Sequence, residues 1–186
     1  MSGVVGLPVW ARVGPQRLAH ITRVVALVDQ WAQGLAVAEL ERDRWLRAAW
    51  LHDALRDADP SELAHWAPGE AGSVELWHGP AAATRAEAEG ETDQGLLAAV
   101  RFHSVGSVDW DRVGQVLYCA DYLEPGRPFE RVERAALAAR LPAEPTQVFF
   151  EVVQRRMLDA VRAGRPIHDS TVTLWNSLAR AGGSRS

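Results

Sequence analysis

Apolar residues recur at the spacing of an α-helix along almost the whole chain, and the alternating pattern of a β-strand is scarce. Ile21, Val24, Val25, Val28 and Trp31 form one such stripe, because three- and four-residue spacings place side chains on one helical face. A length of 186 residues suits one domain. We therefore expect an all-α fold, a single helical bundle over residues 1–183, with residues 184–186 as a frayed tail.

Capping and turn-forming residues divide this pattern into separate helices. Residues 67–72 and 86–95 are expected to be loose, because the first carries Pro and Gly and the second is acidic and poor in large apolar residues. The first expected helix ends near Gly34, and the second runs from about Leu46 toward Asp59-Pro60. Further helices are expected from Ser73 through His78, from about Thr92 to His103, from an Asp109 cap to about Leu123 and from about Glu144 to Ala163. A last short helix is expected to open at Ser170 or Thr171.

The charge and cysteine content restrict the class of function. The net charge is −4 and all 20 basic residues are Arg, so we expect no nucleic-acid duplex as a partner. Arg binds phosphate well but stays protonated and cannot act as a base. No apolar run approaches the ~20 residues of a membrane span, and the start lacks a signal-peptide pattern. The single Cys119 excludes an internal disulfide and fits a reducing compartment, so we expect a cytoplasmic protein without membrane contact.

Ionisable residues close three of the apolar helical runs. His52-Asp53 follows residues 48–51, His103 follows residues 96–102, and Asp121 follows residues 116–120. Such groups are costly to bury unless they are paired or bind a cation. Imidazole together with carboxylate suits a divalent transition metal such as iron, manganese, zinc or cobalt. A carboxylate that bridges two such metals, with His ligands on both sides, would make a two-metal centre able to act on a phosphoryl group.

The order of these residues resembles a known family. His20, His52-Asp53, His78, His103 and Asp121 stand in contexts similar to those of the HD-domain superfamily, and more narrowly of the YqeK-like symmetrical bis(5'-nucleosyl)-tetraphosphatases. The segments that carry the resemblance are AAWLHDALRD, ELWHGPAA, AVRFHSVG, QVLYCADYLEPGRPFERVE and AGRPIHDST, within residues 17–178. The resemblance implies a single HD-domain helical bundle.

It also implies a metal site and an activity. His20, His52, Asp53 and Asp121 would hold one divalent ion, and His78 and His103 a second, with Asp53 bridging the two. Iron is the metal that the resemblance favours, with manganese or another transition metal as alternatives. The implied reaction is hydrolysis of diadenosine tetraphosphate to two ADP by a metal-activated hydroxide.

The turn after Asp121 supplies predicted substrate contacts. Arg127 is expected to bind the polyphosphate and Glu124 to lie at the same site. On spacing alone, a salt bridge from Arg127 to Glu124 or Glu130 is almost as good an interpretation, and the resemblance favours the substrate.

Three further residues complete the predicted site. Arg56 stands where the family usually has Lys, and we expect it to contact phosphate and assist catalysis. Asp57 is expected to orient a water or Arg56, although a solvated surface position is as good an interpretation. His168 is expected either to line the pocket or to be a hydrogen-bonded structural residue, and His65 to lie at the surface.

Two alternatives stay open. An HD phosphohydrolase acting on a nucleoside mono- or triphosphate or on an alarmone would use the same ligands, and Ser104 and residues 86–95 depart from the family near the expected pocket rim. A non-catalytic nucleotide-binding HD domain is the other alternative, and it usually shows lost ligands, whereas all six positions are filled here.

Exposed aromatic surface is compatible with a homodimer. The eight Trp residues are expected in or near the core, with Trp77 left open for base stacking.

Overall fold

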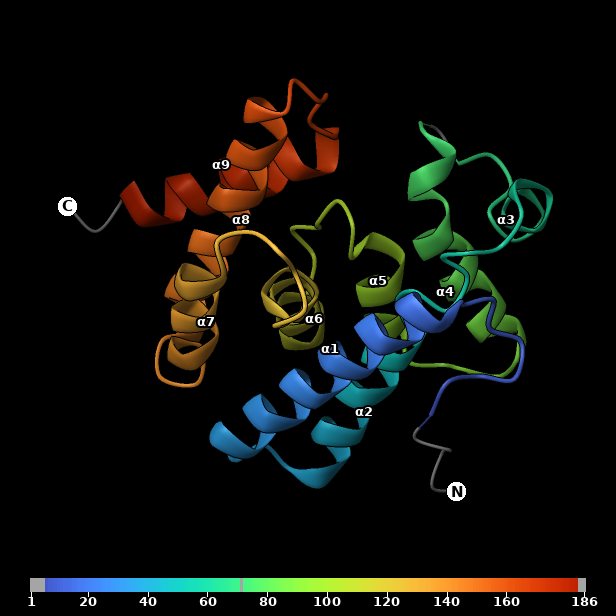
Figure 1. Cartoon of the computed structure of the whole chain (residues 1–186), viewed down its shortest axis with the longest axis horizontal. Coiled ribbons are helices and arrows are strands. Elements are labelled where there is room, and N and C mark those ends of the chain that lie inside the picture. Colours follow the sequence, from blue (N-terminus) through green and yellow to red (C-terminus); the bar gives the residue numbers. More distant parts are fainter. Residues whose placement is uncertain (1–5, 71, 184–186) are drawn as a thin grey trace.

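The computed structural model describes residues 6–70 and 72–183, which form helices and no strand (Figure 1). The all-α prediction is therefore confirmed. The predicted tail 184–186 lies outside the described residues, and the domain limits 1–183 stay a prediction. The helices are α1 (Pro15–Gly34), α2 (Glu39–Leu51), α3 (Pro60–Trp66), the 3-10 helix η1 (Val74–Leu76), α4 (His78–Ala88), α5 (Gln94–Phe102), α6 (Arg112–Leu123), α7 (Arg131–Arg140), α8 (Pro145–Arg162) and α9 (Asp169–Gly183).

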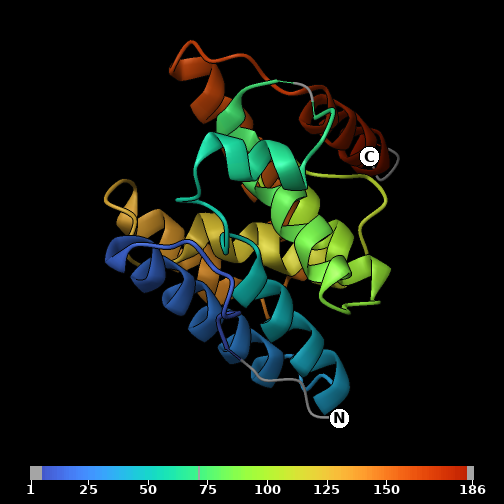
Figure 2. The ribbon, with the colours of Figure 1, turned by 90° about the vertical axis from the view of Figure 1, so that its right-hand side faces the viewer.

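Helix α6 is the centre of the bundle. Every residue from Val116 to Glu124 is buried, as expected for a helix surrounded by others. Helices α1, α2, α5, α7 and α8 all pack against it. Figures 1 and 2 show α1 and α2 as a long antiparallel pair on one side of the bundle and α8 and α9 on another. A polar group on the buried end of α6 therefore faces several other helices.

Helices α4 and α5 approach each other closely at Gly79. A Cβ at this position would lie 2.9 Å from the carbonyl oxygen of Arg101 and 3.2 Å from Cε1 of His103. Glycine therefore permits backbone contact that any other residue would prevent. This contact brings His78, at the start of α4, beside His103, at the end of α5.

The second helix is shorter than predicted. We expected it to run toward Asp59, but α2 ends at Leu51 and residues 52–57 form turns. The segment before α1 forms hydrogen bonds with these turns, in competition with the hydrogen bonds of a continued helix. Arg12 N donates to Ala54 O at 2.7 Å, Asp57 N donates to Arg12 O at 3.1 Å, and Gly14 N donates to the Asp57 carboxylate at 2.7 Å.

Other boundaries also differ from the prediction. Helix α4 continues to Ala88, into the stretch that we expected to be loose. The last helix, α9, is 15 residues long rather than short. Helices α3 and α7 were not predicted, and α7 buries only Arg134 and Leu137, too few for an apolar stripe. The expected helix from Glu144 to Ala163 agrees with α8.

Seven of the eight Trp residues pack in or against the core as expected, and Trp50 is half-buried. Trp10, Trp31, Trp45 and Trp110 are buried, and Trp66, Trp77 and Trp175 pack against the core while partly exposed. Among the described residues, no helix is both long and apolar enough to cross a membrane.

The cap of α6 is Asp111 rather than Asp109. The Asp111 carboxylate accepts from Val113 N at 3.1 Å and from Arg44 at 2.5 Å. We therefore predict that Asp111→Ala lowers the free energy of unfolding by about 1 kcal/mol, the usual cost of losing an N-cap. Asp109→Ala is the matched control and should change it by less than about 0.5 kcal/mol. Urea denaturation followed by circular dichroism measures both, and equal losses would contradict the assignment.

Candidate metal centre

The six predicted ligands meet at one buried place. They come from helices and turns that are distant in the sequence, and they meet because the helices that carry them pack against one another. The residues are His20 on α1, His52 and Asp53 just after α2, His78 at the start of α4, His103 at the end of α5 and Asp121 near the end of α6.

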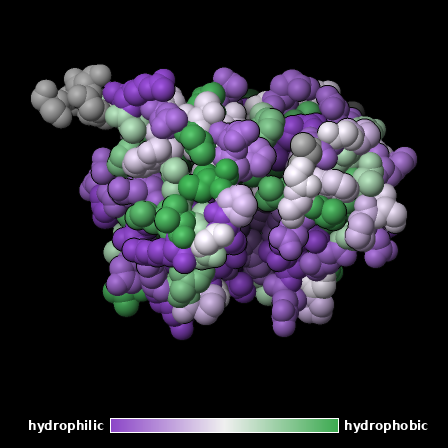
Figure 3. Space-filling view, turned by 90° about the horizontal axis from the view of Figure 1, so that it is seen from above, coloured by the Kyte–Doolittle hydropathy of each residue, from purple (hydrophilic) through white to green (hydrophobic). Residues whose placement is uncertain are grey.

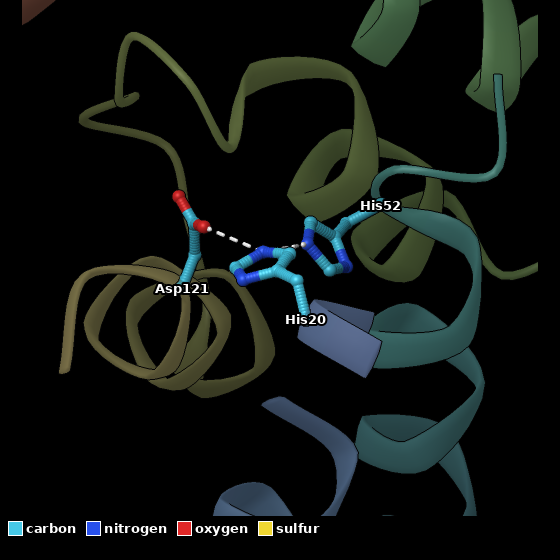
Figure 4. A group of neighbouring side chains, drawn as sticks. All are labelled: His20, His52 and Asp121. Carbon is cyan, nitrogen blue, oxygen red and sulfur yellow. Dashed lines mark hydrogen bonds and ion pairs between the residues drawn. The ribbon is translucent and has the colours of Figure 1, made fainter. Parts of the chain in front are cut away.

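Their ligand atoms form two groups. His20, His52 and Asp121 make one group, which Figure 4 shows converging from three elements. Asp53, His78 and His103 make the other. Within each group the ligand atoms lie within 4.8 Å of one another, close enough for a single cation.

Asp53 joins the two groups. Its Oδ1 lies 3.1 Å from His78 Nε2 and 3.5 Å from His103 Nε2. Its Oδ2 lies 3.5 Å from Nε2 of both His20 and His52. Each carboxylate oxygen thus faces a different pair of imidazoles, which is the arrangement that a bridging ligand requires.

Hydrogen bonds orient all four imidazoles in the same sense. Each Nδ1 faces an acceptor and therefore carries the ring hydrogen, which leaves a lone pair on Nε2. The acceptors are Ala49 O for His52 at 2.7 Å, Val100 O for His103 at 2.7 Å, Glu75 O for His78 at 2.8 Å and Glu124 Oε1 for His20 at 3.1 Å.

The Nε2 atoms then face one another in pairs. His20 Nε2 is 3.4 Å from His52 Nε2, and His78 Nε2 is 3.1 Å from His103 Nε2. Two lone pairs at this separation repel unless a cation or a proton lies between them. With two carboxylates beside them, the donor set fits divalent transition metal ions.

The protonation states of most of these groups suit a metal, whereas the pKa of His20 is raised, because its hydrogen bonds with Asp121 and Glu124 outweigh its burial. Burial lowers the pKa of His78 and lowers that of His52 to about 4, so both imidazoles are neutral near pH 7. Burial alone would raise the pKa of Asp53, but the surrounding imidazoles hold it well below its ordinary value. The pKa of Asp121 is also well below its ordinary value, because His20, Arg127 and Arg156 outweigh its burial. Metal ligation requires neutral imidazole and ionised carboxylate.

Glu124 lies behind His20. Its side chain is 1% exposed, and it accepts hydrogen bonds from His20 Nδ1, from Arg23 Nε at 2.5 Å and from Gly126 N at 2.6 Å. Burial would raise the pKa of Glu124, but these partners bring it down to about 2. The geometry favours an orienting role for Glu124 over the predicted substrate contact.

Three Arg side chains surround the ligands. Arg127 Nη2 lies 2.7 Å from Asp121 Oδ1, closer than its 3.7 Å approach to Glu124. Arg17 Nη1 lies 2.7 Å from Asp53 Oδ2, and Arg156 Nη1 lies 3.4 Å from Asp121 Oδ2. The sequence interpretation missed Arg17 and Arg156. The position of Arg17, one helical turn before His20, is a signal that could have found it.

Arg56 and Asp57 support the backbone near the centre. Arg56 Nη1 donates at 3.0 Å to Glu75 O, the carbonyl that also orients His78. The carboxylate of Asp57 is engaged by Gly14 N. The catalytic roles predicted for both residues stay predictions, and His65 is exposed as expected.

A cavity of 640 Å³ adjoins the second ligand group. Ser104 belongs to its wall, and Ser104 Oγ is 3.2 Å from His103 Nε2. Arg156, Arg165 and His168 also line it, and a role of His168 in substrate binding stays a prediction. Figure 3 looks onto this side of the molecule, which is hollowed near its centre between hydrophilic side chains. The volume is in the range of small-molecule sites.

We predict that Asp53→Asn loses metal from both groups, because the amide offers one neutral oxygen in place of the bridging carboxylate. Elemental analysis of the purified variant should give far less than half of the wild-type metal content, with the helical circular dichroism kept. Asp57→Asn, a neighbouring carboxylate outside both groups, is the matched control and should keep its metal. Equal metal content in Asp53→Asn and the wild type would exclude the bridging role.

Comparison with known proteins agrees with this geometry. The HD domain family matches residues 17–126. The symmetrical bis(5'-nucleosyl)-tetraphosphatase of Bacillus subtilis is 30% identical over 105 residues, 56% of this chain and 55% of that protein. The protein of the same name from Staphylococcus aureus is 26% identical over 103 residues, 55% of this chain and 53% of that protein. The chain thus matches about half the length of these curated relatives.

A solved structure extends the likeness of the fold to nearly the whole chain. It is described as a predicted HD superfamily hydrolase involved in NAD metabolism from Clostridium acetobutylicum, with a TM-score of 0.78 and 21% identity. The alignment covers 91% of this chain and 92% of that one. With a family match over more than half of its residues, including all six ligands of the two groups, this chain belongs to the HD domain family.

Proposed function

We propose that this protein hydrolyses dinucleoside polyphosphates and cleaves diadenosine tetraphosphate symmetrically into two ADP. The observation that carries the proposal is the pair of three-ligand groups joined by Asp53 beside a cavity of 640 Å³. The relatives named as symmetrical bis(5'-nucleosyl)-tetraphosphatases support the substrate. We propose two divalent ions, with iron as the metal in the cell.

The proposed reaction breaks the central P–O–P bond. The oxygen of one water molecule bonds to one central phosphorus, and the former bridging oxygen stays on the other, so that each product is ADP. The two protons of the water pass to the solvent. When bound, two divalent ions in such a centre lower the pKa of water and polarise the phosphoryl oxygens.

The residues of the chain hold the reactants in place. Asp53 keeps the two ligand groups at a fixed separation, and Glu124 and the backbone carbonyls keep the imidazoles oriented. Guanidinium groups surround the two carboxylates, from Arg17, Arg127 and Arg156. A polyphosphate can replace a carboxylate as the partner of such a guanidinium group. Arg56 lies beside His78 and can contact the same phosphates, while His168 lines the cavity in which a nucleoside fits.

Product analysis tests the substrate and the site of cleavage. Metal-loaded protein incubated with diadenosine tetraphosphate should give ADP as the sole nucleotide product by anion-exchange chromatography. Equal amounts of AMP and ATP would contradict symmetric cleavage. If the protein does not hydrolyse diadenosine tetraphosphate but hydrolyses a mononucleotide or an alarmone, the substrate of the centre is that other nucleotide.

The same assay tests the metal mechanism. Asp53→Ala should abolish ADP formation while the helical circular dichroism is kept, because the group with His78 and His103 then lacks a ligand and the bridge to the other group is lost. Turnover retained at the wild-type rate would remove the two-metal mechanism.

Arg127 provides a test of polyphosphate binding. Arg127→Ala should lower kcat/KM at least about tenfold, since a charge-assisted hydrogen bond is worth roughly 1.5–3 kcal/mol. The metal content should stay at the wild-type value, because Arg127 contacts Asp121 without being a ligand. Arg140→Ala removes an exposed Arg that pairs with Glu144 and Glu151 and should leave both quantities unchanged. Loss of metal in Arg127→Ala would instead give Arg127 a structural role.

A further inference from the structure

A second cavity, of 340 Å³, is lined by Arg127, whose guanidinium group contacts the Asp121 carboxylate. We call it the arginine cavity, because Arg127, Arg131 and Arg134 line it. The turn at residues 124–127 forms one wall, Leu27 and Gln30 of α1 form another, and α7 closes it. It is distinct from the 640 Å³ cavity, with which it shares no lining residue.

The arginine cavity carries an excess of positive charge. Its one lining carboxylate, Glu124, is already engaged by His20, Arg23 and Gly126. Arg131 is exposed and makes no ion pair with any other residue in the described part of the chain. Arg127 pairs with Asp121 and approaches Glu124 at 3.7 Å, whereas the guanidinium groups of Arg131 and Arg134 have no carboxylate partner in the cavity.

Two of these guanidinium groups also retain donors without an acceptor. The Nε atoms of Arg127 and Arg134 are buried and have no hydrogen-bond partner within the described residues. Arg134 is 2% exposed, and its other nitrogens donate to the carbonyls of Tyr122, Glu124 and Phe129. Buried charged donors are costly when they are unsatisfied. An anion with several oxygens, such as a phosphate chain, would satisfy them.

The Asp121 carboxylate contacts one lining residue of each cavity. Its Oδ1 contacts Arg127, which lines the arginine cavity, and its Oδ2 contacts Arg156, which lines the 640 Å³ cavity. One carboxylate of the candidate metal centre is thus paired with a guanidinium group from each cavity, and a guanidinium group can bind the oxygens of an anion. The larger cavity includes Tyr118, Ile167 and other apolar side chains suited to a nucleoside.

We propose that the arginine cavity binds one nucleoside diphosphate half of the substrate through its phosphates, while the 640 Å³ cavity binds the other half. This inference rests on the proposed function, since a bond cleaved at the centre of a symmetric molecule leaves equal halves on both sides. Arg131 and Arg134 contact the outer phosphate of the first half, and Arg127 contacts the phosphate nearest to Asp121.

Calorimetric titration of the metal-loaded protein with ADP tests this directly. ADP is one product half, so the wild type should bind two ADP per chain. Arg131→Glu should bind one, because the reversed charge repels the phosphates. This residue opens α7, where an acidic side chain is compatible with the helix dipole, so the fold should be kept.

Arg112→Glu is the matched control. Arg112 is likewise an exposed Arg at the first position of a helix, α6, and it does not line either cavity. This variant should bind two ADP. One ADP per chain in the wild type, two in Arg131→Glu, or one in Arg112→Glu would each overturn the assignment.

The two assays distinguish failure of the proposed function from failure of the arginine cavity as a subsite. If the wild type binds two ADP with the expected loss in Arg131→Glu but does not release ADP from diadenosine tetraphosphate, the reaction is wrong and the nucleoside diphosphate site stands. If it releases ADP but binds only one, the reaction stands and the arginine cavity is not a subsite. In Arg131→Glu, the KM for diadenosine tetraphosphate should rise at least about tenfold relative to Arg112→Glu, the factor that a loss of 1.4 kcal/mol produces.

Discussion

The buried carboxylate of Asp53 between four imidazoles is the constraint on which the rest of the structure depends. Burial of an ionised group costs several kcal/mol, so a core that holds Asp53 and Asp121 needs compensating cations. The neutral imidazoles of His52 and His78 supply oriented lone pairs rather than charge. Positive charge comes from the edge of the site, from Arg17, Arg127 and Arg156. Divalent ions between the Nε2 atoms would neutralise both carboxylates at once. The centre is therefore most stable when it binds metal.

The helical bundle is arranged to bring these groups together. The close approach at Gly79 places His78 beside His103, and the buried end of α6 carries Asp121. The turn after α2 lets Asp53 point away from the helical path, and the segment before α1 holds that turn in place. Packing of apolar helices thus determines where the polar ends meet, and the chemistry of the site follows from that meeting point.

The sequence predicted the convergence of the candidate ligands better than it predicted their surroundings. Four of the candidate ligands lie at the end of an apolar run, namely His52, Asp53, His103 and Asp121. An ionisable residue in that position can be recognised from the sequence alone. Arg156 contacts Asp121 from 35 residues away, and Arg23 reaches Glu124 across the bundle, so no local spacing identifies them. The cap at Asp111 was missed because Asp109 and Asp111 both precede the helix, and only the hydrogen bond from Val113 N distinguishes them. Helix α7 was missed because Arg134 and Leu137, its buried residues, form no apolar stripe.

Anomalous X-ray diffraction from crystals of the metal-loaded protein tests the bridging centre most directly. Data collected at the absorption edge of the bound metal locate each ion independently of any assumed geometry. The account predicts two peaks roughly 3.5–4 Å apart, one on each side of the Asp53 carboxylate, as in other two-metal sites. A single peak, or two peaks of which only one lies within bonding distance of Asp53, would contradict it.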